Sequence, residues 1–190
     1  MEALKQQSAQ PHYTYKDYAS WELKEGERFE LLDGVPYAIS APSPVHQGIS
    51  GELHRQFANF LHGKPCKVFH APFDVRLNAK GDKDDNVVQP DLLVICDKTK
   101  IDDKGCNGAP DLVVEIVSPS SSKHDRFIKF QKYQNAGVRE YWIVDIEANG
   151  IEVALLKDEK YTVLKYLEED VIFSSVLEGF QINVKEIFAE

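Results

Sequence analysis

The chain has 190 residues and carries 22 Lys and Arg against 31 Asp and Glu, a formal net charge of −9. This balance argues against a generic nucleic-acid coat, because nonspecific affinity for nucleic acids comes mostly from Lys and Arg that neutralise phosphates. The chain has no N-terminal apolar segment, no run of 18 apolar residues and no CxxC spacing among its three cysteines. We therefore expect a cytoplasmic protein with no membrane span, disulfide framework or zinc knuckle.

The N-terminal region is expected to hold a tail and a short helix. The length fits one domain, which we place over residues 13–188, behind a flexible tail of residues 1–12. Thr14 and Asp17 have the spacing of a capping box and predict a helix over residues 14–23.

A hairpin and a long helix are predicted next. Asp33-Gly34, which favours a type I′ turn, separates residues 28–32 from residues 35–39 and predicts that these two segments pair. Ser43-Pro44 then predicts the start of a helix that reaches about residue 62, since apolar residues follow at helical spacing.

Strands dominate the rest of the chain. We predict them over residues 67–77, 87–95, 110–117, 139–145, 151–156, 161–167 and 171–173. One of three serines at 120–122 is suited to cap a helix that ends at Gly137, and a small helix is expected near residues 184–188. Because no repeat or low-complexity linker interrupts this order, it predicts an α/β domain with a mixed sheet.

Two of these apolar strands each carry a carboxylate, Asp91 in one and Glu115 in the other. Burying an ionised carboxylate without a partner is costly, so each requires compensation. The midpoint between them, residue 103, falls in a polar stretch with turn-forming residues, and strands that fold back there would bring the carboxylates side by side. Adjacent carboxylates repel unless they share a proton or a cation, so a hard divalent metal with oxygen ligands is the simplest explanation.

Charge is unevenly distributed along the chain. Residues 118–139 carry five basic residues against one acid, whereas residues 145–190 carry eleven acids against four lysines. A basic strip on an acidic body can bind a phosphate backbone if it lines the site. The alternative, an ordinary solvated helix face, stays open on charge alone.

Two levels of resemblance follow from these motifs. Pro90-Asp91, a spacer and Glu115 in an apolar strand resemble the PD-(D/E)xK nuclease signature, although Val117 stands where that superfamily has its lysine. Six longer segments resemble the Uma2 family of predicted endonucleases; they are Glu30–Gly34, Ser43–Gln47, Ala71–Val75, Val88–Leu92, Pro110–Ser120 and Gly137–Asp145. The similarity covers about Tyr13 to Glu186 and implies an α+β, restriction-endonuclease-like fold in which helices flank a mixed central sheet.

The resemblance implies a magnesium-dependent DNA endonuclease, with Mn²⁺ as a possible substitute. Asp91 and Glu115 would be metal ligands, and the Ile116 carbonyl would be a further candidate. The missing lysine would have migrated to the following helix as Lys129, where it would hold the attacking water and offset the charge that develops on phosphorus. Glu30 matches an upstream acidic residue of the family and is expected to bind metal through water or to hold Lys129 in place.

Other basic residues are candidates for substrate binding. These are His46, Lys123, Arg126 and Lys132. His46 also has a capping or packing interpretation, and Lys123 and Lys132 can equally be surface residues. The expected partner is DNA, and a homodimer is expected because cutting both strands of a duplex needs two sites.

Several structural interpretations compete with this hypothesis. Glu115 could be half of a structural ion pair, and Lys129 a solvated helix lysine. Asp111 is expected to be a turn or cap residue, and Tyr141 and Trp142 are expected in the core. At the level of function, the alternatives are a catalytically silent nucleic-acid or protein-binding member of the same fold, and a glycosidase with Asp91 and Glu115 as its acid pair.

Overall fold

A computed structural model describes residues 11–117 and 124–189, without the side chains of residues 124–126. Most of the predicted tail, residues 1–10, lies outside this range, as do the serines predicted to cap the helix before Gly137. Within the described part of the chain, no helix combines the length and the apolar character needed to cross a membrane.

The larger sheet has six strands in the order β12-β11-β10-β9-β6-β3. Its strands are β3 (Lys67–His70), β6 (Leu92–Ile95), β9 (Leu112–Val117), β10 (Glu140–Asp145), β11 (Gly150–Lys157) and β12 (Lys160–Tyr166). All six residues of β9 are buried, and β9 pairs in parallel with β10 and antiparallel with β6. β9 is therefore a central strand, because only a strand with neighbours on both edges and cover on both faces is buried throughout.

A second six-stranded sheet has the order β2-β1-β5-β4-β8-β7, and β13 pairs with β14 in a separate two-stranded sheet. These strands are β1 (Arg28–Leu32), β2 (Val35–Ile39), β4 (Val75–Arg76), β5 (Val87–Val88), β7 (Ile101–Asp102), β8 (Gly105–Asn107), β13 (Val171–Phe173) and β14 (Gln181–Asn183). The β1–β2 hairpin matches its predicted bounds. Asp33 and Gly34 both have positive φ, as a type I′ turn requires.

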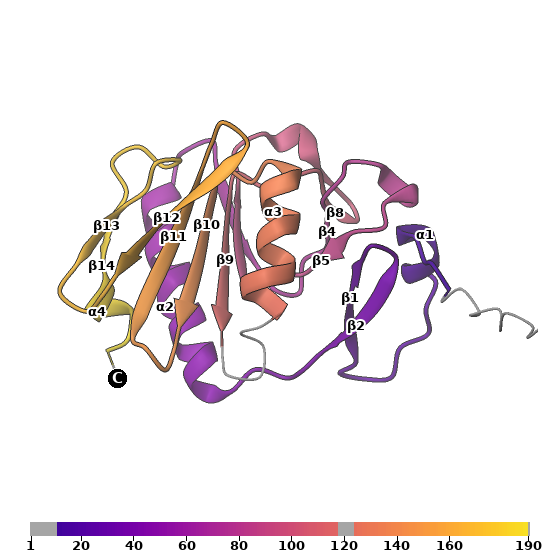
Figure 1. Ribbon diagram of the computed structural model, residues 1–190, viewed down its shortest axis with the longest axis horizontal. Coiled ribbons are helices and arrows are strands. Elements are labelled where there is room, and N and C mark those ends of the chain that lie inside the picture. The colour runs from indigo at the N-terminus through magenta and orange to yellow at the C-terminus, as the bar shows by residue number, and fades with distance from the viewer. Residues whose placement is uncertain (1–10, 118–123, 190) are drawn as a thin grey trace, which may run out of the picture.

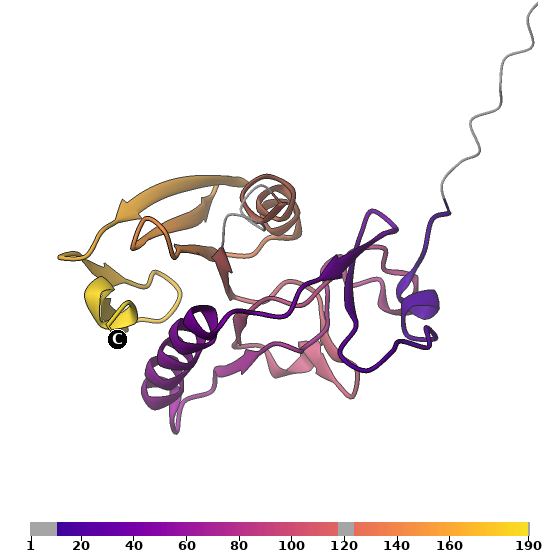
Figure 2. The ribbon, with the colours of Figure 1, turned by 90° about the horizontal axis from the view of Figure 1, so that it is seen from below.

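Helices lie on both faces of the larger sheet (Figures 1 and 2). The helical elements are α1 (Tyr15–Tyr18), α2 (Pro44–Leu61), η1 (Gly81–Lys83), η2 (Lys98–Lys100), η3 (His124–Lys129), α3 (Phe130–Ala136) and α4 (Val184–Ile187). The apolar stripe of α2 packs on the face of β9 that bears Val114, whereas Tyr133 of α3 packs on the face that bears Val113. Glu115 belongs to the face covered by α3, since strand residues alternate between faces.

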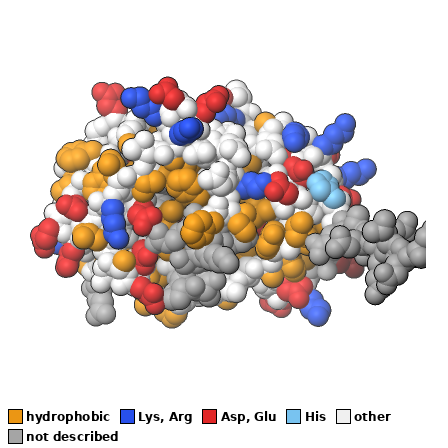
Figure 3. Space-filling model, viewed as in Figure 1, with side chains coloured by type: hydrophobic (Ala, Val, Ile, Leu, Met, Phe, Trp, Pro, Cys, Tyr) orange, Lys and Arg blue, Asp and Glu red, His pale blue; other side chains and the backbone are white. Residues whose placement is uncertain are grey.

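The surface mixes charge and apolar area. On the face shown in Figure 3, hydrophobic side chains form a band across the middle, and Lys, Arg, Asp and Glu gather mainly toward the margins. Large exposed hydrophobic residues include Phe127, Val163 and Leu164. Charged side chains of both signs are interspersed on this face, so the described residues present no extended patch of one sign there.

Sequence expectations of three kinds were wrong in detail. The strand predicted over residues 67–77 divides into β3 and β4, and the strand predicted over residues 87–95 divides into β5 and β6, so that Asp91 lies between two strands. In each case the two halves belong to different sheets, because Pro72 and Pro90 at the breaks lack the N–H that a continuous strand would need to donate. The first helix is a single turn with the predicted capping box at Thr14 and does not extend to residue 23.

The third correction concerns the cysteines. Cys66 and Cys96 form a disulfide although their spacing indicated none. The antiparallel register of β3 and β6 places Lys67 opposite Ile95, so the residues just beyond this pair face each other. Cys106 is a buried free thiol, and burial raises its pKa to about 11.

Candidate active site

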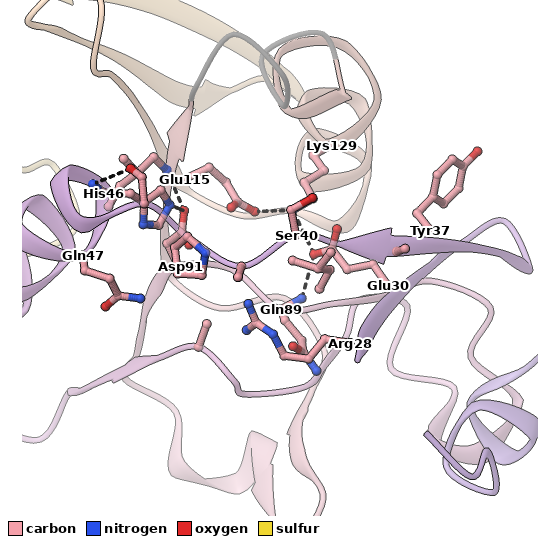
Figure 4. A pocket seen from close by; sticks show the side chains of 17 residues that line it. Arg28, Glu30, Tyr37, Ser40, His46, Gln47, Gln89, Asp91, Glu115 and Lys129 are labelled. Carbon is pink, nitrogen blue, oxygen red and sulfur yellow. Dashed lines mark hydrogen bonds and ion pairs between the residues drawn. The ribbon is translucent and has the colours of Figure 1, made fainter. Parts of the chain in front are cut away.

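Six segments far apart in the sequence enclose one cavity of about 510 Å³. They are the β1–β2 hairpin, the start of α2 with the residues before it, Ala71 after β3, the segment between β5 and β6, strand β9 and the end of η3 (Figure 4). The polar and charged side chains among the lining residues are Arg28, Glu30, Tyr37, Ser40, Ser43, His46, Gln47, Gln89, Asp91, Glu115 and Lys129. All four residues predicted to be catalytic therefore border the same space.

Lys129 lies between two carboxylates inside this cavity. Its Nζ is 2.8 Å from Glu30 Oε1 and 3.0 Å from Glu115 Oε1. The three side chains are only 4–6% exposed. Lys129 is therefore a buried cation rather than a solvated helix lysine. Such a group is tolerated because two carboxylates balance its charge, and removing one member of the group would leave an uncompensated buried charge.

Tyr133 is a site residue that the sequence analysis did not find. Its hydroxyl donates to Glu115 Oε1 at 2.6 Å, the same oxygen that Lys129 contacts. Burial raises the pKa of Tyr133 well above its usual value, and the nearby Glu115 and Glu30 carboxylates raise it further. Tyr133 thus stays protonated and remains a donor. The four-residue spacing from Lys129 was the available signal, since residues four apart share a helix face.

Asp91 is held opposite Glu115. Leu92 pairs with Val114 in the antiparallel β6–β9 ladder, and extending this register by one residue pairs Asp91 with Glu115. The two strands are thus related about position 103, as predicted, although η2, β7 and β8 occupy the connection where a turn was expected. Asp91 Oδ2 accepts a hydrogen bond from the Ile116 N–H at 2.8 Å.

His46 connects Asp91 to the start of α2. Its Nε2 is 3.1 Å from Asp91 Oδ2, and its backbone N–H donates to the N-cap Ser43 Oγ at 3.2 Å. The backbone is therefore part of the helix cap, whereas the ring is turned into the cavity toward a carboxylate. The sequence predicts phosphate contact, capping or packing for His46, and no sequence pattern indicates this contact with Asp91.

Gln89 links Glu30 to the N-terminal part of the fold and was also missed. Its backbone N–H donates to Glu30 Oε1 at 2.9 Å, and its side-chain amide donates to Asp74 Oδ1 at 2.9 Å and to the Tyr18 hydroxyl at 3.1 Å. Burial raises the pKa of Asp74, and the hydrogen bond from Gln89 offsets only part of this increase. No spacing rule relates residues 18, 30, 74 and 89, because they come from separate elements.

The donor chemistry of the cavity fits a hard cation. Asp91 and Glu115 supply carboxylate oxygens, and Ile116 also lines the cavity. The N–H and C=O of one strand residue point to the same side, so the Ile116 carbonyl faces the same way as the N–H that donates to Asp91. In the part of the chain that the structure describes, however, no three His, Cys, Asp or Glu side chains are grouped to hold a metal. Asp91, Glu115 and the Ile116 carbonyl are therefore the candidate ligands among the described residues.

Of the other predicted substrate-binding residues, only Lys132 has a side chain that the structure describes. Lys132 pairs with Asp33 at the tip of the β1–β2 hairpin and does not line the cavity. Lys123 lies outside the described residues, and Arg126 is described only in its backbone, within η3.

The residues predicted to be structural do not line the cavity. Asp111 accepts hydrogen bonds from the Cys96 N–H and from Arg139 Nη2, both at 2.6 Å, at the opposite end of β9 from Glu115 and Ile116. Asp111 therefore anchors neighbouring segments. Tyr141 and Trp142 have no exposed surface, which confirms that they belong to the core.

Known proteins resemble this chain along most of its length. Residues 15–185 match the profile of Uma2, described as "Putative restriction endonuclease". The "Uncharacterized protein slr1290" of Synechocystis sp. (strain ATCC 27184 / PCC 6803 / Kazusa) is 29% identical over 178 residues, which cover 92% of this chain and 91% of that protein.

A solved structure is also similar. It is described as "a putative nuclease belonging to DUF820" from Anabaena variabilis ATCC 29413, and superposes with a TM-score of 0.73 at 17% identity over 93% of this chain and 97% of that one. The predicted fold class, a mixed α/β arrangement flanked by helices, is thereby confirmed.

Proposed function

The chain belongs to the Uma2 family, and on that premise we propose that it is a metal-dependent endonuclease that hydrolyses phosphodiester bonds in DNA. The observation that carries the proposal is the buried Lys129 ammonium, held by Glu30 and Glu115 in the cavity that Asp91 also borders. A metal held by two carboxylates, with a buried lysine beside it, can supply the activated water and the neutralised phosphoryl oxygen that phosphodiester hydrolysis needs.

The proposed reaction adds water across one P–O bond. The water oxygen bonds to phosphorus, the bond to the leaving alkoxide breaks, and one proton passes overall from the water to that alkoxide. A divalent cation held by Asp91, Glu115 and the Ile116 carbonyl would supply Lewis-acid activation of the phosphoryl oxygen and lower the pKa of water. Lys129 orients the attacking water through its N–H groups and offsets negative charge in the transition state.

The neighbouring groups keep these residues in place. Glu30 fixes the Lys129 ammonium through the 2.8 Å ion pair, and Tyr133 fixes one Glu115 oxygen through its hydroxyl. His46 and the Ile116 N–H both contact Asp91 Oδ2. Pre-organised groups of this kind lower the reorganisation that the reaction requires.

Cleavage of supercoiled plasmid in Mg²⁺ or Mn²⁺ tests the proposal. We expect the wild-type protein to nick or linearise the plasmid, and E115A and K129A to lose about a hundredfold or more of the rate, as expected when a charge-stabilising group is removed. K160A is the matched control, because Lys160 is exposed at the start of β12. If K129A cuts the plasmid at the wild-type rate, the proposed mechanism is wrong.

The second candidate function is a catalytically silent nucleic-acid-binding member of the fold. It is favoured by the ion pairs of Lys129 with both Glu30 and Glu115, which give each of these buried charges a partner within the protein. Metal-independent binding of DNA, with no cleavage of DNA or RNA duplexes in Mg²⁺ or Mn²⁺, would select this function.

The endonuclease proposal includes a homodimer, because cutting the two strands of a duplex needs two sites. Sedimentation velocity measures the oligomeric state.

A further inference from the structure

Arg28 faces the cavity without a role in the groups described so far. It lies two residues before Glu30 in β1, so the two side chains share one face of the hairpin. The β1–β2 register places Arg28 opposite Ile39 and Glu30 opposite Tyr37, and all four residues line the cavity. In Figure 4 the Arg28 side chain extends from β1 beside Gln89.

Among the described residues, no carboxylate lies in an ion pair with the Arg28 guanidinium. The carboxylates of the cavity pair with other groups, Glu30 and Glu115 with Lys129, and Asp91 with His46. The Arg28 side chain is half-buried. An arginine is always charged, so the position favours a ligand that brings a negative charge.

The charge balance of the cavity indicates which ligand fits. Its lining carries three carboxylates and two fixed cations, Lys129 and Arg28, which leaves one net negative charge when His46 is neutral. A divalent cation at the carboxylates would turn this into one net positive charge. A phosphodiester group carries a single negative charge, and its two non-bridging oxygens match the planar donors of a guanidinium.

We propose that Arg28 binds a backbone phosphate of the nucleic-acid substrate. The inference rests on the proposed nuclease function and names the residue that contacts the backbone at the cavity. This role differs from that of Lys129, because Arg28 pairs with none of the three cavity carboxylates and is therefore available to contact substrate.

Fluorescence anisotropy with a labelled 20-base-pair DNA duplex tests the proposal, with Ca²⁺ in place of Mg²⁺ to separate binding from cleavage. We expect R28A to weaken binding by about tenfold or more and to reduce the slope of log Kd against log salt by about one, as loss of one phosphate contact does. R28K is expected to lie between R28A and the wild type, since lysine keeps the charge and loses the bidentate geometry.

R55A is the matched control, because Arg55 is exposed on α2, pairs with Glu52 and does not line the cavity. R28Q provides a second uncharged variant if R28A does not fold. If R28A or R28Q binds the duplex with the same affinity and the same salt slope as R55A, Arg28 does not contact the phosphate. The same conclusion follows if R28A lowers only kcat for cleavage. Either result would leave the nuclease proposal standing. A wild-type protein that neither binds nor cuts the duplex would overturn both proposals.

Discussion

Replacing Lys129 with methionine tests the buried ion group independently of any activity. Methionine keeps the length of the side chain and removes the ammonium that Glu30 Oε1 and Glu115 Oε1 contact at 2.8 and 3.0 Å. Glu30 would keep its hydrogen bond from the Gln89 N–H, and Glu115 would keep that from Tyr133. Two buried carboxylates would nevertheless face each other without a cation.

The expected loss can be estimated from this geometry. Breaking a buried ion pair by removing one partner costs about 3–5 kcal/mol in the free energy of unfolding. For a chain of this size each kcal/mol shifts the melting temperature by about 2–4 °C, so K129M should melt about 6–20 °C below the wild type. Urea unfolding followed by circular dichroism measures the free energy, and a thermal scan measures the shift.

Two further variants make the result interpretable. K160M changes an exposed lysine in the same way and should stay within about 0.5 kcal/mol of the wild type. K129M combined with E30Q should be more stable than K129M alone, because one of the two opposed charges is gone. Equal stability of K129M and K160M would refute the conclusion that Lys129 is a buried partner of two carboxylates.

Other predictions concern single contacts. Tyr133→Phe removes the hydroxyl that donates to Glu115 and should lower the free energy of unfolding by about 1.5–3 kcal/mol, measured by urea unfolding. Thiol titration of the unreduced protein should detect no reactive thiol in the native state, one after denaturation, namely Cys106, and three after reduction. Lys132 lowers the pKa of Asp33, chiefly through a hydrogen bond. This pair therefore stabilises the fold fully above the ordinary Asp pKa of about 3.9. The stabilisation is lost as the pH falls through the lowered pKa of Asp33. The thermal difference between wild type and Asp33→Asn should therefore be small but present at neutral pH, since Asp33 is exposed, and should vanish in acid.

Each of these predictions has an outcome that contradicts it. A Tyr133→Phe protein as stable as the wild type would mean that the hydroxyl does not hold Glu115. Three reactive thiols in the unreduced, denatured protein would exclude the disulfide. A wild-type advantage over Asp33→Asn that grows toward low pH would have the wrong sign for a carboxyl whose pKa is lowered by folding.

Local patterns were sufficient for much of the secondary structure. The Asp33-Gly34 turn predicted the β1–β2 hairpin, and Ser43-Pro44 predicted the start of α2. Both signals act through the backbone conformation of neighbouring residues, so they do not depend on the rest of the fold. The prediction of one strand over residues 67–77 was wrong because sheet membership is not a local property. The sequence pattern could not reveal that the two halves of this segment join different sheets.

The carboxylate strands show how far sequence reasoning reached into the site. The apolar residues on both sides of Glu115 and the polar stretch about residue 103 were enough to predict a strand here and a neighbouring segment that places Asp91 opposite Glu115. The register between β3 and β6 places Cys66 opposite Cys96, where they form a disulfide. No residue pattern indicated that these two strands are neighbours.

The sequence by itself thus determined which side chains belong to each strand or helix face, because periods of two and of 3.6 residues are properties of the local backbone. Only the tertiary structure decided which faces meet. It placed Lys129 and Tyr133 against Glu115, and it brought Arg28 into the same cavity. Val117, the position where the superfamily has its lysine, is instead a buried apolar residue of β9, and the ammonium comes from a segment that packs over the strand.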